Sequence, residues 1–111
     1  RGAGGGGFVD LSGVGDGEAA RRINSVRADL VVDLNGWTSG NRAGVFASRP
    51  CRVQVQYMGF PGTTGAPFVD YGVWDRVTAP PELSQGGVSE GVMVMPLSYF
   101  VSDYYQAAQE A

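Results

Sequence analysis

The region that most constrains this chain runs from residue 53 to residue 71, where a strand pattern changes into a loop rich in glycine and proline. Val53, Val55 and Tyr57 alternate with two glutamines, which is the period-two pattern of a β-strand. The loop then carries Gly59, Pro61, Gly62 and Gly65. Such a loop continues neither strand nor helix, and it lets other groups approach the main chain closely. The pattern predicts a buried strand that ends in a ligand-facing loop, as in open α/β sheets.

Other short apolar runs alternate with helical patterns. Strands are predicted at residues 8–12, 30–34, 71–75 and 91–95, and helices at 18–28, through Ala47 and from Pro81. The run at 30–34 is rich in β-branched residues, which predicts a strand buried on both faces. This alternation favours an α/β fold with a parallel sheet. Right-handed crossovers would bring the loops 35–40 and 59–65 to one edge of that sheet, facing one cleft.

The length of 111 residues is enough for one domain, and a hydrophobic share of 43% predicts that the chain folds. Residues 1–7 are almost all glycine, so we expect this part to be disordered or a loop insertion. The folded domain is therefore expected at residues 8–111. Because the chain begins with arginine instead of methionine, we expect it to be a fragment of a longer protein.

The charged residues and the cysteine limit the kinds of site and partner that the chain can have. The net charge is −3, and no basic cluster is present, so we expect no nucleic-acid partner. All eight basic residues are arginines, and the chain lacks histidine, the commonest general base and metal ligand. A single cysteine, Cys51, excludes an internal disulfide and a multi-cysteine zinc site. We therefore expect no metal site. We also expect no membrane partner, since no apolar run approaches the roughly 20 residues of a membrane span.

Several polar and aromatic residues have two interpretations each. Trp37 can be a platform for a sugar or peptide, or it can cap the core. Arg42 and Arg49 can meet an anionic group or lie on a solvated helix face. Acid–base roles or loop-stabilising roles are both open for four aspartates: Asp10, Asp33, Asp70 and Asp75. These patterns alone predict an α/β domain with a ligand-facing edge.

Specific motifs resemble the O-linked N-acetylglucosamine (O-GlcNAc) transferases. The motif N-G-W-T stands at residues 35–38, F-A-S-R-P at 46–50 and Q-Y-M-G-F-P-G-T-T-G-A at 56–66. The similarity continues through S-E at 89–90 and Y-F-V-S-D-Y at 99–104. It covers nearly the whole chain after the glycine run. The resemblance identifies the chain as part of the catalytic region of this family.

The resemblance implies a fold and an activity. The family is nucleocytoplasmic and has tetratricopeptide (TPR) repeats before two Rossmann-like lobes in the GT-B glycosyltransferase arrangement. It transfers N-acetylglucosamine from UDP-N-acetylglucosamine (UDP-GlcNAc) to serine or threonine hydroxyls of acceptor proteins, with inversion and without a metal or other cofactor. This chain resembles the later part of the N-terminal lobe, so a Rossmann-like parallel sheet with flanking helices is expected. Its partners would be the acceptor proteins, the second catalytic lobe and the repeats.

Site residues follow from the resemblance position by position. Residues expected to line the donor sugar or the acceptor are Met58, Gly59, Pro61, Trp37 and Arg42. The family's catalytic histidine and lysine groups match no position of this chain, so we expect no catalytic residue in it and no turnover by it alone. Relatives often have lysine or histidine at three positions that carry Ser39, Gly7 and Gly91 here.

Two alternatives stay open. The chain can belong to a non-catalytic protein-interaction module, or pseudo-enzyme, that keeps the lobe. It can also belong to the relatives that transfer fucose, although the motif M-G-F-P-G-T at 58–63 argues against them.

Overall fold

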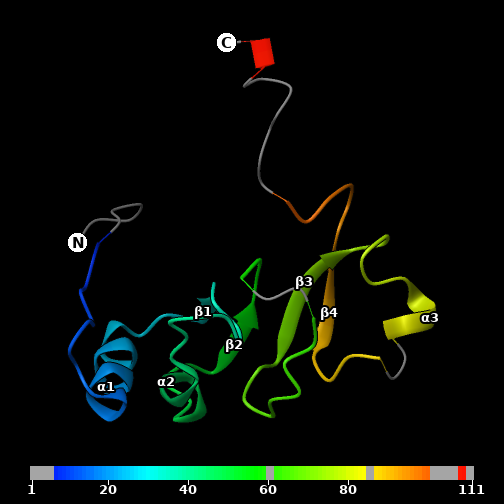
Figure 1. Cartoon of the computed structure of the whole chain (residues 1–111). Helices are drawn as coiled ribbons and strands as arrows, with labels where there is room; N and C mark the ends of the chain where they lie inside the picture. Colours follow the sequence, from blue (N-terminus) through cyan, green and yellow to red (C-terminus); the bar gives the residue numbers. More distant parts are fainter. Residues whose placement is uncertain (1–6, 60–61, 85–86, 101–107, 110–111) are drawn as a thin grey trace.

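The computed structural model describes residues 7–59, 62–84, 87–100 and 108–109, and it contains a four-stranded sheet (Figure 1). The strands are β1 (Leu30–Asp33), β2 (Val53–Gln56), β3 (Tyr71–Asp75) and β4 (Gly91–Met95). They lie in the order β1-β2-β3-β4, and each neighbouring pair is parallel. The predicted α/β fold with a parallel sheet is therefore confirmed.

Three helices accompany the strands: α1 (Asp16–Val26), α2 (Ala43–Ala47) and α3 (Pro81–Ser84). Helix α1 ends where Arg27 adopts the left-handed conformation, with a φ of 56°, and donates its N–H to Asn24 O. Helix α2 connects β1 to β2, and α3 connects β3 to β4. A proline suits the first helical position because its missing N–H would have no partner there.

The strands are staggered along the sheet. Residues 30–33 of β1 pair with residues 53–56 of β2 over their full length. In contrast, Tyr71 at the start of β3 lies beside Val55, and Gly91 at the start of β4 lies beside Tyr71. The third and fourth strands therefore begin where the second strand ends. The segment between β2 and β3 reaches the residue just before β4, where Glu90 accepts hydrogen bonds from Thr63 and Thr64.

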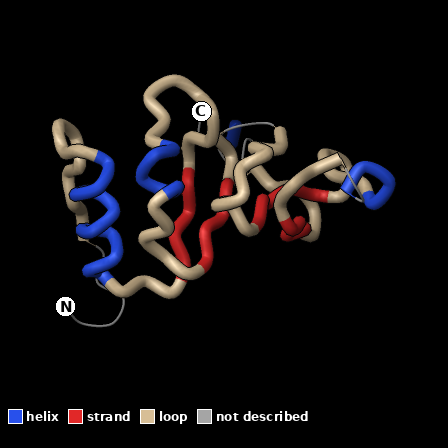
Figure 2. The backbone as a smooth tube through the Cα atoms, turned by 90° about the horizontal axis from the view of Figure 1, so that it is seen from below, coloured by secondary structure: helices blue, strands red, loops and turns tan. Residues whose placement is uncertain are grey.

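The two glutamines of β2 lie on the helix-covered face of the sheet and are each only 1% exposed. Gln54 Nε2 donates to the carbonyls of Phe46, in α2, and Phe68 at 2.9 and 2.7 Å. Helices α1 and α2 lie on the same side of the first two strands (Figure 2). The Nε2 hydrogen bonds offset part of the cost of burying these polar side chains, whereas Gln54 Oε1 is buried without a hydrogen-bond partner among the described residues.

The opposite face of the sheet is only partly covered within the described residues, where Val55 and Asp75 lie on it at 3% and 5% exposure. The register places on it five side chains that are 41–44% exposed: Leu30, Val32, Tyr71, Met93 and Met95. The prediction that strand 30–34 is buried on both faces is therefore wrong. The reason is that the described helices α1 and α2 cover one face of β1 and leave Leu30 and Val32 uncovered.

Residues 8–12 form no strand, so that prediction is also wrong. Asp10 accepts hydrogen bonds from the N–H and hydroxyl of Ser12, and Val14 N donates to Leu11 O, which makes turns instead. The Leu11 side chain packs with Val14 and Ile23 against a small core of Ala19, Ala20 and Val45 between α1 and α2. Of the apolar residues in this segment, Leu11 therefore packs on the helix pair, while Phe8 and Val9 are exposed.

Some expectations concern residues outside the described part. The glycine-rich run falls mainly on residues 1–6, and the last four residues of the Y-F-V-S-D-Y motif fall on residues 101–104. Among the helices of the described residues, none is long and apolar enough to cross a membrane.

Candidate functional site

The loops that follow β1 and β2 meet at the carboxyl end of these strands. Tyr57 N donates to Asp33 O at 3.0 Å, which extends the pairing of the two strands by one residue. The Asp33 carboxylate accepts the N–H groups of Asn35 and Gly36 at 2.9 and 3.3 Å. These bonds fix the start of residues 35–40, which we call the tryptophan loop.

Trp37 joins the tryptophan loop to residues 62–65, which we call the threonine loop. Its indole Nε1 donates to Thr64 O at 2.8 Å, while the side chain stays 46% exposed. Trp37 therefore does not cap the core; it lies at the sheet edge with much of its ring open to solvent. The predicted juxtaposition of the two loops is confirmed.

Met58 and Gly59 make a tight, strained turn directly after β2. Met58 has a φ of 66°, a conformation that is unfavourable for a bulky side chain. Gly59 N donates to Tyr57 O at 2.8 Å, so the three residues form a γ-turn of the strained type. A Cβ atom at position 59 would overlap the carbonyl of Leu34 and lie 2.6 Å from Asn35 Cα. Only glycine allows the two loops to approach this closely.

The threonine loop is held by two buried polar side chains. Gln56 Nε2 donates to Gly62 O at 3.1 Å. Glu90, which is 5% exposed, accepts Thr64 N at 2.6 Å, Thr63 Oγ1 at 2.7 Å and the hydroxyl of Thr64. Burial by itself raises the pKa of Glu90, but the hydrogen bonds from Thr64 and Thr63 outweigh it and bring the pKa below its ordinary value. Glu90 is therefore a buried carboxylate that is stabilised in its ionised form.

A cavity of about 10 Å³ lies between the two loops, with Asp33, Trp37, Thr64 and Phe68 among its lining residues. This space is about the size of one water molecule. A wider groove of about 320 Å³ lies between α1 and the end of α2, lined in part by Arg21 and Arg49. The residues predicted for the site do not line that groove. Within the described residues, the candidate site is therefore the rim formed by the two loops and not a deep pocket.

Arg42 points toward the N-terminal segment. Its guanidinium donates to Leu11 O at 2.8 Å and Val14 O at 2.5 Å and pairs with Asp16 Oδ1 at 2.9 Å. In this arrangement the side chain ties the segment before α1 to the start of α2. The structure thus places Gly59 against the start of the tryptophan loop and Trp37 against Thr64, while the guanidinium of Arg42 is engaged elsewhere. Pro61 lies outside the described residues.

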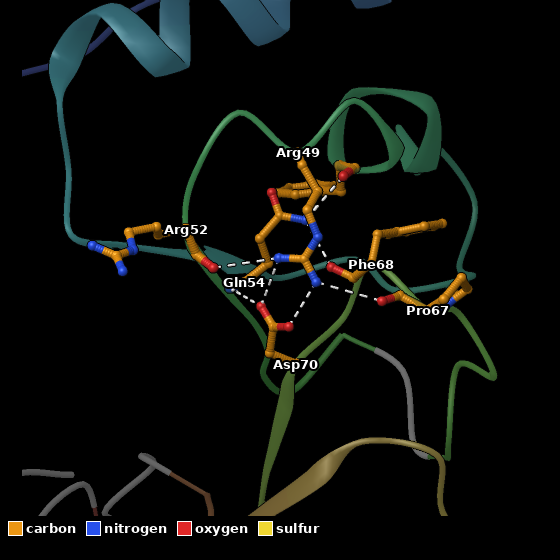
Figure 3. A network of polar contacts seen from close by, with 7 residues as sticks. Arg49, Arg52, Gln54, Pro67, Phe68 and Asp70 are labelled. Carbon is orange, nitrogen blue, oxygen red and sulfur yellow. Dashed lines mark hydrogen bonds and ion pairs between the residues drawn. The ribbon is translucent and has the colours of Figure 1, made fainter.

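The four candidate aspartates, Asp10, Asp33, Asp70 and Asp75, all accept backbone N–H groups, which supports the loop-stabilising interpretation. The N–H of Thr78 is the main reason why the pKa of Asp75 lies below its usual value, and Asp75 also accepts Tyr99 N at 3.1 Å. Asp70 accepts Gln54 N and also forms a two-pronged ion pair with Arg49, at 2.7 and 3.1 Å (Figure 3). Arg49 therefore meets an anionic group, and this group is within the chain.

Two positioning residues, Gln56 and Glu90, were not predicted. Their partners lie 6 residues away for Gln56 and 26 or 27 residues away for Glu90, so no local pattern connects them. For Gln56, one signal was available in the sequence: glutamines occupy alternate positions of a strand that was predicted to be buried. For Glu90 the contact depends on the course of the segment between β2 and β3, which only the three-dimensional structure shows.

Comparisons with known proteins agree with this architecture. The model of glycosyl transferase family 41 matches residues 3–110. The chain is 41% identical over 103 residues to the Arabidopsis thaliana protein named probable UDP-N-acetylglucosamine–peptide N-acetylglucosaminyltransferase SEC. It is 39% identical over 100 residues to the UDP-N-acetylglucosamine–peptide N-acetylglucosaminyltransferase of Caenorhabditis elegans. These alignments cover 93% and 89% of this chain but only 10% and 9% of the relatives.

A solved structure extends the comparison to the fold. A mutant O-GlcNAc transferase of Thermobaculum terrenum superposes with a TM-score of 0.76 and 29% identity. The superposition covers 81% of this chain and 17% of the other. The parallel sheet with its flanking helices therefore corresponds to part of a GT-B glycosyltransferase, as the resemblance implied. The chain spans about a tenth of the length of the curated relatives that it matches. On the match of nearly its whole length, this chain belongs to glycosyl transferase family 41.

Proposed function

We propose that this chain is the acceptor-side part of the N-terminal catalytic lobe of a protein O-GlcNAc transferase. The complete enzyme would transfer N-acetylglucosamine from UDP-GlcNAc to serine or threonine hydroxyls of proteins, with inversion. Membership of glycosyl transferase family 41 and the names of the relatives support this reaction class. The donor would be the only small molecule required, without a metal or a further cofactor.

One observation carries the proposal: the strained turn at Met58 lies against the tryptophan loop on an exposed rim. Met58 is held at a φ of 66°, and Gly59 packs on the backbone of Leu34. Backbone strain of this kind persists only where the surroundings enforce it, and it concentrates at functional sites. In the proposed enzyme this turn presents Met58 and the main chain of Gly59 to the donor sugar and the acceptor. Trp37 lines the adjacent peptide path.

The contribution of this chain to catalysis would be binding and orientation. Its 111 residues contain no histidine and no lysine. Proton transfer and the neutralisation of charge on the diphosphate leaving group would therefore depend on groups of the second lobe and of other segments. A rigid turn that holds the acceptor hydroxyl near the anomeric carbon lowers the entropic barrier of the transfer. The second lobe, TPR repeats and acceptor proteins would be its partners, in the cytoplasm and nucleus.

The experiment replaces Met58 by alanine in the complete gene product that contains residues 1–111. Met58→Ala keeps the backbone strain and removes the side chain, so kcat/KM for peptide glycosylation is expected to fall by about tenfold or more. Leu97→Ala is the matched control, because Leu97 is 92% exposed after β4. Transfer is measured by mass spectrometry of a serine-containing peptide with UDP-GlcNAc. Equal kcat/KM values for the two variants would contradict a role of Met58 in the site.

A non-catalytic interaction module is the second candidate. It is favoured by Ser39 and Gly91, because the O-GlcNAc transferases that this chain resembles commonly have lysine at these two positions. A module would bind the peptide but consume no nucleotide sugar.

The same assay with GDP-fucose tests the fucose-transferring alternative, since turnover of that donor alone would reassign the reaction.

A further inference from the structure

We propose that Glu90 is a positioning residue that holds the threonine loop, and through it Trp37, in the geometry required at the rim. This inference rests on the proposed function for its kinetic part only. Glu90 is not among the residues that resemblance or surface exposure places at the site. It acts through its hydrogen bonds to Thr63 and Thr64 and has no contact with substrate.

Both carboxylate oxygens of Glu90 are occupied by one short segment. Oε1 accepts the N–H of Thr64 at 2.6 Å and also its hydroxyl, and Oε2 accepts the hydroxyl of Thr63 at 2.7 Å. Thr63 Oγ1 in turn accepts Ser89 N at 2.9 Å. The hydroxyls of Thr63 and Ser89 share a further hydrogen bond at 3.0 Å, so five hydrogen bonds among the described residues join the segment before β4 to the threonine loop.

Thr64 passes this restraint to the other loop. Its N–H and hydroxyl are bound by Glu90, while its carbonyl accepts the indole N–H of Trp37 at 2.8 Å. A shift of Thr64 would thus release or misplace the indole. The three residues Glu90, Thr64 and Trp37 form a continuous connection from the start of β4 to the loop after β1.

The carboxylate of Glu90 is informative because a charged group is costly to bury. Ion pairs among the described residues use Glu18, Asp16 and Asp70, whereas Glu90 is surrounded by hydroxyl and amide donors. Charge-assisted hydrogen bonds are shorter and stronger than neutral ones. A buried anion with three donors from one loop therefore fixes that loop more firmly than a neutral side chain of the same size would. Simple filling of space would not require the charge.

The test compares Glu90→Gln with Glu82→Gln in the complete gene product. Glutamine keeps the shape of the side chain and removes the charge, and Glu82 is an exposed glutamate on α3. Hydrogen–deuterium exchange of a peptide covering residues 62–66 is the first readout, and it requires no activity. Glu90→Gln is expected to speed exchange of the Thr64 amide by about 10- to 100-fold. Glu82→Gln is expected to leave it unchanged.

The second readout separates positioning from stability. With Glu90→Gln, the KM for the acceptor peptide is expected to rise by about tenfold, because the rim is misplaced in folded enzyme. Loss of folded protein alone would lower the apparent kcat and leave KM unchanged. If Glu90→Gln does not fold, Thr63→Val replaces it, since it removes one donor to the carboxylate and the acceptor of Ser89 N.

Each outcome has a defined meaning. Unchanged exchange at residues 62–66 in folded Glu90→Gln overturns the anchoring role. Faster exchange with an unchanged acceptor KM overturns the positioning role. If the wild-type gene product transfers no sugar, the proposed function fails, while the exchange measurement still decides whether Glu90 anchors the loop.

Discussion

Gly59 packs directly on the carbonyl group of Leu34, with no space between the two residues for a side chain. This contact sets the distance between the turn after β2 and the tryptophan loop. It also means that part of the candidate site is formed by main-chain atoms, which side-chain substitutions elsewhere cannot reproduce.

Replacing Gly59 by alanine is expected to displace one loop from the other. Overpacking of this kind costs about 1–3 kcal/mol of stability, and a displacement of about 1 Å at a reacting site lowers the rate by about 100-fold. We therefore expect peptide glycosylation by Gly59→Ala to fall by about that factor. Gly17→Ala is the control, because a Cβ atom there meets nothing within 4 Å and alanine favours helix α1. Its activity should be retained, and normal activity of Gly59→Ala would contradict the close approach.

Trp37 offers two separable contributions, an N–H donor and a ring face. Trp37→Phe removes the bond to Thr64 O and keeps an aromatic ring, so we expect local stability to fall by about 1 kcal/mol with a small change in acceptor KM. Trp37→Ala also removes the ring and should raise the acceptor KM further, by about tenfold, if the ring contacts the peptide. Peptide kinetics of both variants measure the difference. Equal KM values in Trp37→Ala and the wild type would exclude a ring contact with the acceptor.

Arg42 is expected to act on the N-terminal segment. Arg42→Lys cannot reach Leu11 O, Val14 O and Asp16 at once, so the segment before α1 should open with a loss of about 1–3 kcal/mol. Hydrogen exchange of residues 8–20 measures this opening, and Arg52→Lys, at an exposed position, serves as the control. The prediction that Arg42 lines the acceptor path is tested in the same variant. An increase in acceptor KM without faster exchange would favour that role over the structural one.

The Asp70–Arg49 ion pair makes the stability of the folded protein depend on pH in the acidic range. The hydrogen bonds from Arg49 hold the pKa of Asp70 below its ordinary value of 3.8, despite partial burial that raises it. A carboxylate whose pKa is lowered on folding stabilises the protein above its unfolded-state pKa, and this contribution is lost as the pH falls through the lowered value. We expect Asp70→Asn to be less stable than the wild type at pH 7, with a difference that shrinks below about pH 4.

Urea unfolding between pH 2 and 7 measures that dependence. The exposed Asp29→Asn provides the control for loss of a surface charge. A stability difference between Asp70→Asn and the wild type that stays constant down to pH 2 would show that the ion pair is not its cause.

Local patterns predicted the elements of the sheet well. The strands at Tyr71–Asp75 and Gly91–Met95 agree with the predicted bounds, because turn residues and Pro96 mark their limits in the sequence. The segment 8–12 was misassigned because an apolar run does not reveal its partner. Leu11 packs against a helix pair, and its carbonyl binds an arginine 31 residues away.

The same reasoning explains the partial prediction of the site. The meeting of the two loops follows from the handedness of parallel crossovers, so the position of Trp37 near the threonine loop was accessible from sequence. The strain at Met58 was not, because a positive φ at a non-glycine residue has no composition signature. Glu90 was missed because its role depends on the course of the segment between β2 and β3, which carries Thr63 and Thr64.

The buried glutamines of β2 have a consequence for how the chain finds its fold. Side chains alternate between the two faces of a strand, so a slip of one residue would turn Gln54 and Gln56 toward the apolar face and set valines against the carbonyls of Phe46 and Phe68. Each misaligned pairing would thus leave carbonyls without donors and amides without acceptors. Valine-rich strands discriminate poorly between neighbouring alignments, and two uncharged amides supply that discrimination at any pH at which the protein folds.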